Sequence, residues 1–122
     1  MKALIQRVSE ASVSVNKKEI AQIGAGYLIY LGITHEDTAE TAMRLAKKIL
    51  ALRIFSDKND KINLSILDVK GQLLVISQFT LYADTSRGNR PSFTPSAPPA
   101  HAEALYEYFT NLCRQKISDV GQ

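Results

Sequence analysis

Alternation of apolar and polar residues marks the first part of the chain as β structure. Residues 11–15 alternate between apolar side chains and serines, which is the pattern of a strand with one buried face. Residues 2–8 and 19–23 are also extended in character, and 16–18 has the composition of a turn. The uninterrupted apolar run 27–33 predicts a strand that is buried on both faces.

Two later segments have helical periodicity. Residues 39–50 place apolar side chains on one side and most charged side chains on the other. Asp37 and Glu40 have the spacing of a capping box at the start of this helix. A second helix is expected to begin near Pro98 or Pro99, because proline is well tolerated in a first turn. Its predicted buried stripe consists of Leu105, Tyr108, Phe109 and Leu112.

The segment between the helices predicts further strands and one long loop. A hairpin is expected around the turn-forming residues 56–60, and 73–76 is an apolar strand. All four prolines fall within 84–99, which predicts a loop without regular structure. The order of elements predicts an α/β fold, with a mixed sheet or two packed sheets and helices on one side.

Length and composition limit the class of protein. A chain of 122 residues without repeats or linkers is expected to form one domain over 1–122. Its net charge of +3 favours anionic partners without requiring them. No apolar stretch reaches the roughly 18 residues of a membrane span, and the polar start is unlike a signal peptide, so we expect a cytoplasmic protein. With Cys113 as the only cysteine and no metal-ligand spacing, no disulfide and no metal ion are expected.

The end of the apolar run 73–76 is the first candidate for chemistry. Ser77, Gln78, Phe79 and Thr80 follow it, and ligands often bind just beyond the ends of buried strands. These residues would present two hydroxyls and an amide without any charge. The alternative is that they form the hydrogen bonds of a turn.

The loop 87–93 is the second candidate. Arg87 and Arg90 stand on either side of a glycine and ahead of Phe93, which suits the binding of phosphate and stacking on a base. The alternative is a solvated loop with Phe93 packed into the core. His35 and His101 lack a nucleophile motif beside them, so we expect a structural role for both, and Cys113 is expected to be a small buried residue.

Four segments, in this order, resemble the D-aminoacyl-tRNA deacylase family. They are Met1–Val8 (MKALIQRV), Leu52–Asp57 (LRIFSD), Ser77–Asp84 (SQFTLYAD) and Arg87–Phe93 (RGNRPSF). The resemblance implies hydrolysis of the ester that joins a D-amino acid to tRNA, as a proofreading step in translation. It further implies a homodimer with a three-layer architecture of sheets and helices, an active site at the dimer interface, and no cofactor.

The resemblance also implies roles for individual residues. Ser77, Gln78, Phe79 and Thr80 would line the pocket, and Ala102 would lie near the terminal adenosine. Two catalytic schemes remain open: Thr80 as nucleophile, or main-chain groups around Phe79 assisted by the 2′-hydroxyl of the RNA. The second is favoured on physical grounds, because an unassisted threonine is a poor nucleophile and no base to activate it is evident.

One feature of the family is missing from residues 1–122. The family carries a C-terminal Gly-Pro dipeptide with a cis peptide bond, which enters the partner's pocket and excludes L-amino acids, whereas this sequence contains no Gly-Pro. We therefore expect a domain truncated at its C-terminus, with weakened chiral selection. Two alternatives to the deacylase also stand: a non-catalytic tRNA-binding relative, and an editing enzyme for glycyl-tRNA or other mischarged tRNA.

Overall fold

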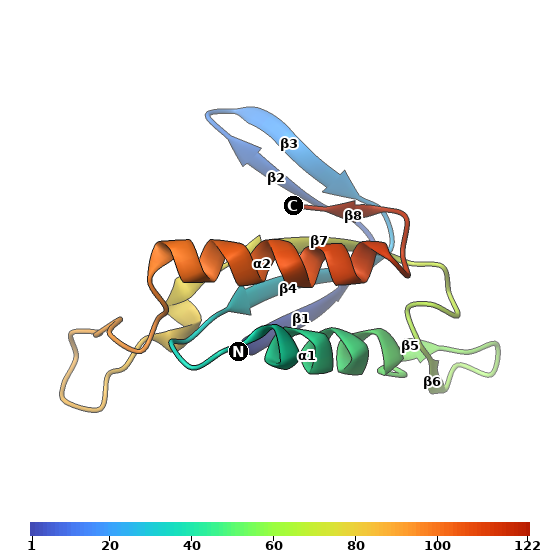
Figure 1. Ribbon diagram of the computed structural model, residues 1–122. Coiled ribbons are helices and arrows are strands. Elements are labelled where there is room, and N and C mark those ends of the chain that lie inside the picture. The colour runs from blue at the N-terminus through green and yellow to red at the C-terminus, as the bar shows by residue number, and fades with distance from the viewer.

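Four strands form the central sheet, in the order β1-β4-β7-β8 (Figure 1). In the computed structural model, which describes residues 1–122, β1 (Lys2–Val8) pairs antiparallel with β4 (Gly26–Gly32). The next strand, β7 (Gln72–Ser77), pairs parallel with β4 and also with the short β8 (Val120–Gly121). The two predicted apolar runs are therefore confirmed as neighbouring central strands.

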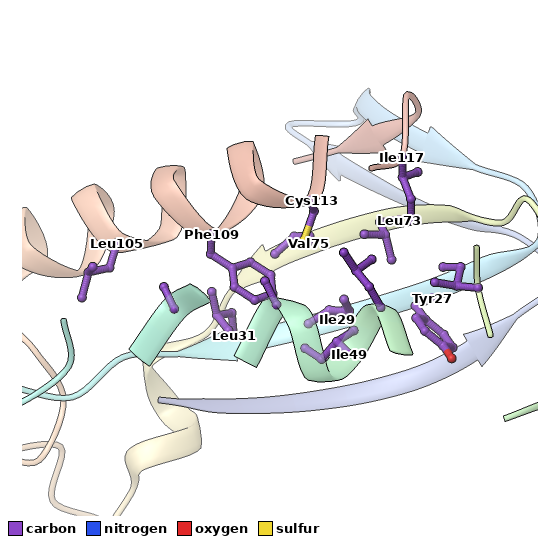
Figure 2. Packing of buried hydrophobic residues seen from close by; sticks show 14 of the residues in the cluster. Tyr27, Ile29, Leu31, Ile49, Leu73, Val75, Leu105, Phe109, Cys113 and Ile117 are labelled. Atoms are coloured by element: carbon purple, nitrogen blue, oxygen red, sulfur yellow. The ribbon is translucent and has the colours of Figure 1, made fainter. Parts of the chain in front are cut away.

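Two helices cover one face of this sheet, which confirms the mixed α/β architecture (Figure 1). They are α1 (Ala39–Ala51) and α2 (Pro99–Arg114), which begins at one of the two predicted prolines. Figure 2 shows Ile49 of α1 and Phe109 of α2 directed at Ile29 and Val75 of the sheet. Phe109 is fully buried, and truncation of such a ring costs about 3–5 kcal/mol.

The predicted buried stripe of α2 needs one correction. Leu105 and Phe109 are buried as expected, but Tyr108 is 38% exposed, and Cys113 is fully buried in its place. Residues 105, 109 and 113 are spaced four apart, and a stripe at this spacing turns the residue at 108 toward the helix flank. The expected role of Cys113 as a small buried residue is confirmed.

The start of α1 also differs from the prediction. The N-cap is Thr38, whose hydroxyl accepts a hydrogen bond from the Thr41 N–H, while the Thr41 hydroxyl accepts from the Thr38 N–H. Asp37 is turned into the protein, and Glu40 forms an exposed ion pair with Arg44 at 2.8 Å. The capping box therefore lies one residue later than predicted, because Thr38 has the extended backbone that a cap needs.

Two hairpins complete the fold. The first consists of β2 (Ala11–Val15) and β3 (Lys18–Ile23), joined by Asn16 and Lys17 in the left-handed conformation, as the predicted turn requires. This hairpin leads away from the helices, and β3 contacts β7 and β8 (Figure 1). The second pairs β5 (Phe55–Ser56) with β6 (Ile62–Leu64), so the predicted hairpin is confirmed but shorter than expected.

Candidate active site

The chain turns sharply where β7 ends. After Ser77 it enters a single 3-10 turn, η1 (Phe79–Tyr82), which confirms the turn that was the alternative prediction for residues 77–80. The N–H of Gln78 donates to the Leu31 carbonyl at 2.8 Å, which fixes the turn against the end of β4. Gly32 permits this approach, since a Cβ there would lie 2.9 Å from Cβ of Leu81. The end of β4 therefore sets the position of η1.

A pocket of about 640 Å³ opens beside Ser77 and Phe79. Four of the residues predicted from the sequence lie in its wall: Ser77, Phe79, Phe93 and Ala102. The other lining residues are His35, Ser96, Ala97, Pro98, Pro99, Glu103 and Tyr106. Residues from β7, the proline-rich loop and the start of α2 thus meet in one cavity.

Contacts within the wall hold the aromatic side chains in place. The rings of Phe79 and Phe93 meet edge to face, with centroids 5.2 Å apart. The Ser96 hydroxyl donates to the Phe79 carbonyl at 2.9 Å, and this ties the proline-rich loop to η1. Phe79 is 58% exposed and Phe93 37% exposed, so both rings are accessible to a ligand.

The remaining predicted residues lie outside the pocket lining. The Gln78 side-chain amide donates to the Thr80 hydroxyl, and both residues are partly buried beside the pocket. Arg87 and Arg90 are exposed in the loop that leads to Phe93. Asp84 and Ser92 close the base of this loop through two main-chain hydrogen bonds of 2.7 and 2.8 Å.

Four lining residues with polar side chains were not predicted as site residues from the sequence: His35, Ser96, Glu103 and Tyr106. His35 Nε2 donates to the Thr94 carbonyl at 2.7 Å, so this nitrogen is occupied. The Tyr106 hydroxyl donates to the Val75 carbonyl at 2.7 Å, and burial raises the pKa of Tyr106 to about 12, so it stays protonated. Glu103 is the only carboxylate in the lining. Tyr106 lies four residues after Ala102 on the same helix face. This spacing is the only sequence feature from which Tyr106 could have been predicted as a pocket residue.

The lining determines what the pocket can bind. It offers two exposed aromatic rings, two serine hydroxyls, and main-chain groups at the strand end. This combination suits an uncharged planar group such as a nucleobase together with a polar ester. No group of three or more His, Cys, Asp or Glu residues is arranged to hold a metal ion.

A second cavity lies apart from this site. It measures about 480 Å³ and is lined by residues of α1 and α2, by the two residues that follow α2, and by Leu67. Lys47, Lys116 and Gln115 are its only polar lining residues, so it lacks the convergent polar groups of a reaction site.

None of the helices is long and apolar enough to span a membrane.

Fold and pocket together define a small α/β domain with a cavity at the end of a central strand, lined by aromatic rings, hydroxyl groups and a single carboxylate. The chain matches the family described as "D-Tyr-tRNA(Tyr) deacylase" over residues 4–122, and it belongs to this family. It is 56% identical to a D-aminoacyl-tRNA deacylase of Mannheimia succiniciproducens over 117 residues, which are 96% of this chain and 81% of the relative.

Two solved structures share the fold. One, described as "c-Myc DNA Unwinding Element Binding Protein", is 37% identical and matches with a TM-score of 0.93 over 100% of this chain and 85% of the other. Another is described as "Structural Analysis of a probable eukaryotic D-amino acid tRNA deacylase". It is 20% identical, with a TM-score of 0.80 over 93% of this chain and 67% of the other, and it supports the fold alone.

Proposed function

We propose that this protein hydrolyses the ester bond of D-aminoacyl-tRNA, releasing the D-amino acid and free tRNA as a proofreading step in translation. The observation that carries the proposal is the meeting of Ser77, Phe79, Phe93 and Ala102 in one pocket, in a chain of the D-Tyr-tRNA deacylase family. In the reaction, water adds to the ester carbonyl carbon, the bond to the ribose oxygen breaks, and that oxygen takes up a proton.

The roles of the wall residues follow from the chemistry of the ester. Main-chain N–H groups at Phe79 donate to the carbonyl oxygen as negative charge develops on it, a contribution of about 3 kcal/mol for one well-placed donor. Ser77 positions the aminoacyl group, and Gln78 holds Thr80 in place through their side-chain hydrogen bond. Ala102 leaves room for the terminal adenosine. The reaction needs no metal or organic cofactor, because an aminoacyl ester is already activated.

The location of Thr80 supports the main-chain scheme over a threonine nucleophile. Its hydroxyl is engaged by Gln78, and Thr80 does not line the pocket. Both histidines use Nε2 to donate to main-chain carbonyls, and neither forms a hydrogen bond with Thr80. We expect Thr80→Val to keep substantial deacylase activity. A fall in kcat of about four orders of magnitude with tRNA binding intact would instead identify Thr80 as the nucleophile.

The basic loop supplies the proposed contact with tRNA. Arg87 and Arg90 are exposed, and the loop that carries them ends at Phe93 in the pocket wall. The guanidinium groups of this loop would bind phosphates next to the aminoacylated 3′ end, while Phe93 stacks on a base. Because charged tRNA is made and used where translation occurs, we place the protein in the cytoplasm.

The outer face of the sheet supports a homodimer. Leu4, Tyr30 and Ile76 are neighbours across β1, β4 and β7 on the face opposite the helices. Leu4 is 50% exposed, and the other two side chains are partly exposed. A second copy of the chain on this face would remove the apolar surface from water. In such a dimer the active site would lie at the interface, as the family resemblance implies.

Deacylation assays separate the proposal from its alternatives. Purified protein is incubated with tRNA charged with D-tyrosine, L-tyrosine or glycine, and release of each amino acid is measured against buffer. The proposal expects D-tyrosine to be released fastest. Release of glycine alone would indicate an editing enzyme of different specificity, and tRNA binding without any release would indicate a non-catalytic relative.

A further inference from the structure

The carboxylate of Asp37 is buried in the turn that precedes α1. Asp37 is only 6% exposed. Its Oδ1 accepts a hydrogen bond from the α-amino group of Met1 at 2.7 Å, and its Oδ2 accepts from the Thr34 N–H at 2.8 Å. A buried carboxylate is costly without such partners, so the two contacts fix both the side chain and the turn.

The main chain of Asp37 contacts the second helix. Its carbonyl accepts from His101 Nε2 at 2.9 Å, and its N–H donates to the Thr34 carbonyl at 3.2 Å. His101 lies in the first turn of α2, directly before Ala102 in the pocket wall. Asp37 therefore ties the turn 34–37 to the helix end that borders the pocket.

The same turn also holds the proline-rich loop. The Thr34 hydroxyl donates to the Pro95 carbonyl at 2.5 Å, and His35 Nε2 donates to the Thr94 carbonyl at 2.7 Å. The Ala97 N–H donates to the Ile33 carbonyl at 2.9 Å. Residues 94–97 are thereby anchored to the turn, and two of them, with His35, form part of the pocket wall.

We propose that Asp37 is a positioning residue for the deacylase pocket, acting through the turn 34–37 on the two walls built by residues 94–97 and by the start of α2. Asp37 does not line the pocket itself. The inference rests on the proposed function, because it assigns these walls to the aminoacyl end of tRNA. A displacement of about 1 Å in groups that orient a reacting ester lowers the rate by about a hundredfold.

Glu36 provides a matched control for the charge. It is the neighbouring residue, carries the same charge, is exposed, and has no hydrogen bond or ion pair from its side chain. Glu36→Gln therefore removes one negative charge from the same turn without touching the network. Asp37→Ala removes both side-chain contacts, whereas Asp37→Asn keeps an oxygen acceptor for the Thr34 N–H. The Asn variant keeps the test informative if the Ala variant does not fold.

The test measures hydrolysis of D-tyrosyl-tRNA and of a short D-tyrosyl adenosine ester, which contacts only the pocket. We expect Asp37→Ala to lower kcat/KM by about a hundredfold and Asp37→Asn by about tenfold, with Glu36→Gln unchanged. The KM for the short ester is also expected to rise in both Asp37 variants. This KM is independent of the concentration of folded enzyme, so a merely structural role would leave it unchanged. A folded Asp37→Ala protein with the parent's KM and kcat/KM would overturn the proposal.

Proton NMR of the two histidine rings gives a readout that needs no deacylase activity. His101 binds the Asp37 carbonyl, and His35 lies in the same turn, so we expect both ring signals to shift in Asp37→Asn and to stay in place in Glu36→Gln. If the parent protein hydrolyses no D-aminoacyl ester, the proposed function is wrong. The histidine signals then still show whether Asp37 positions residues 94–97 and the start of α2. Unchanged signals in Asp37→Asn would refute that.

Discussion

Gly32, at the end of β4, lies directly against the turn η1, and replacing it with alanine tests how tightly the pocket is built. A Cβ at this position would lie 2.9 Å from Cβ of Leu81, 3.2 Å from Cδ2 of Tyr82 and 3.3 Å from the Gln78 carbonyl oxygen. Two of these neighbours are backbone or Cβ atoms, which cannot move by rotating a side chain. The added methyl group must therefore push η1 away from the strand.

The geometry sets the size of the effect. Relief of the contact to Leu81 requires a shift of about half an ångström or more, and overpacking of this kind costs about 1–3 kcal/mol of stability. Because η1 begins with Phe79, the same shift moves the main-chain groups assigned to catalysis. We expect kcat/KM for D-tyrosyl-tRNA to fall by about ten- to a hundredfold in the fraction that remains folded.

Urea unfolding and deacylation assays measure both effects in Gly32→Ala. Gly24→Ala is the matched control, since the Cβ there would meet only the flexible end of the Gln72 side chain at 3.3 Å. The control is expected to change stability by less than about 0.5 kcal/mol and to leave activity intact. If Gly32→Ala proves as stable and as active as the parent, the close approach of η1 does not position the catalytic groups.

Other consequences of the structure can be measured independently. Arg87→Ala and Arg90→Ala should weaken tRNA binding and make it less dependent on salt, because fewer counterions are released on binding; an unchanged salt slope in both would leave the loop a structural role. Tyr27→Phe should raise the free energy of unfolding by about 1 kcal/mol, since the buried Tyr27 hydroxyl has no hydrogen-bond partner; a loss of stability would reveal a partner. Burial raises the pKa of the Cys113 thiol to about 11, so iodoacetamide at pH 8 should modify the folded protein far more slowly than the unfolded chain, and equal rates would contradict this burial.

The sequence predicted those elements whose side-chain pattern is dominated by burial. The apolar run 27–33 became β4, and the helical repeat over 39–50 became α1, because each pattern matches one regular structure. Asp37 was incorrectly predicted to cap α1, because its role depends on tertiary contacts and not on a local side-chain pattern. Its partners are the amino group of Met1 and the N–H of Thr34, and pairing with Met1 requires the chain to bring distant segments together.

The candidate site was only partly predictable, because some of its residues follow from a local pattern and others are brought there by tertiary contacts. Residues 77–80 stand out because an apolar strand ends there, and Ser77 and Phe79 do line the pocket. His35 gave no such signal, because its place in the wall depends on the turn 34–37 packing against the proline-rich loop. The catalytic roles assigned to residues 77–80 remain predictions, which the deacylation experiments test.

The most direct test of the central claim is the rate at which this protein releases the amino acid from D-tyrosyl-tRNA compared with L-tyrosyl-tRNA, each corrected for spontaneous hydrolysis in buffer. We predict hydrolysis of the D-ester well above the spontaneous rate and faster than that of the L-ester. Release of D-tyrosine no faster than in buffer would contradict the assignment of this protein as a D-aminoacyl-tRNA deacylase, and equal rates for both esters would contradict the predicted preference for the D-ester.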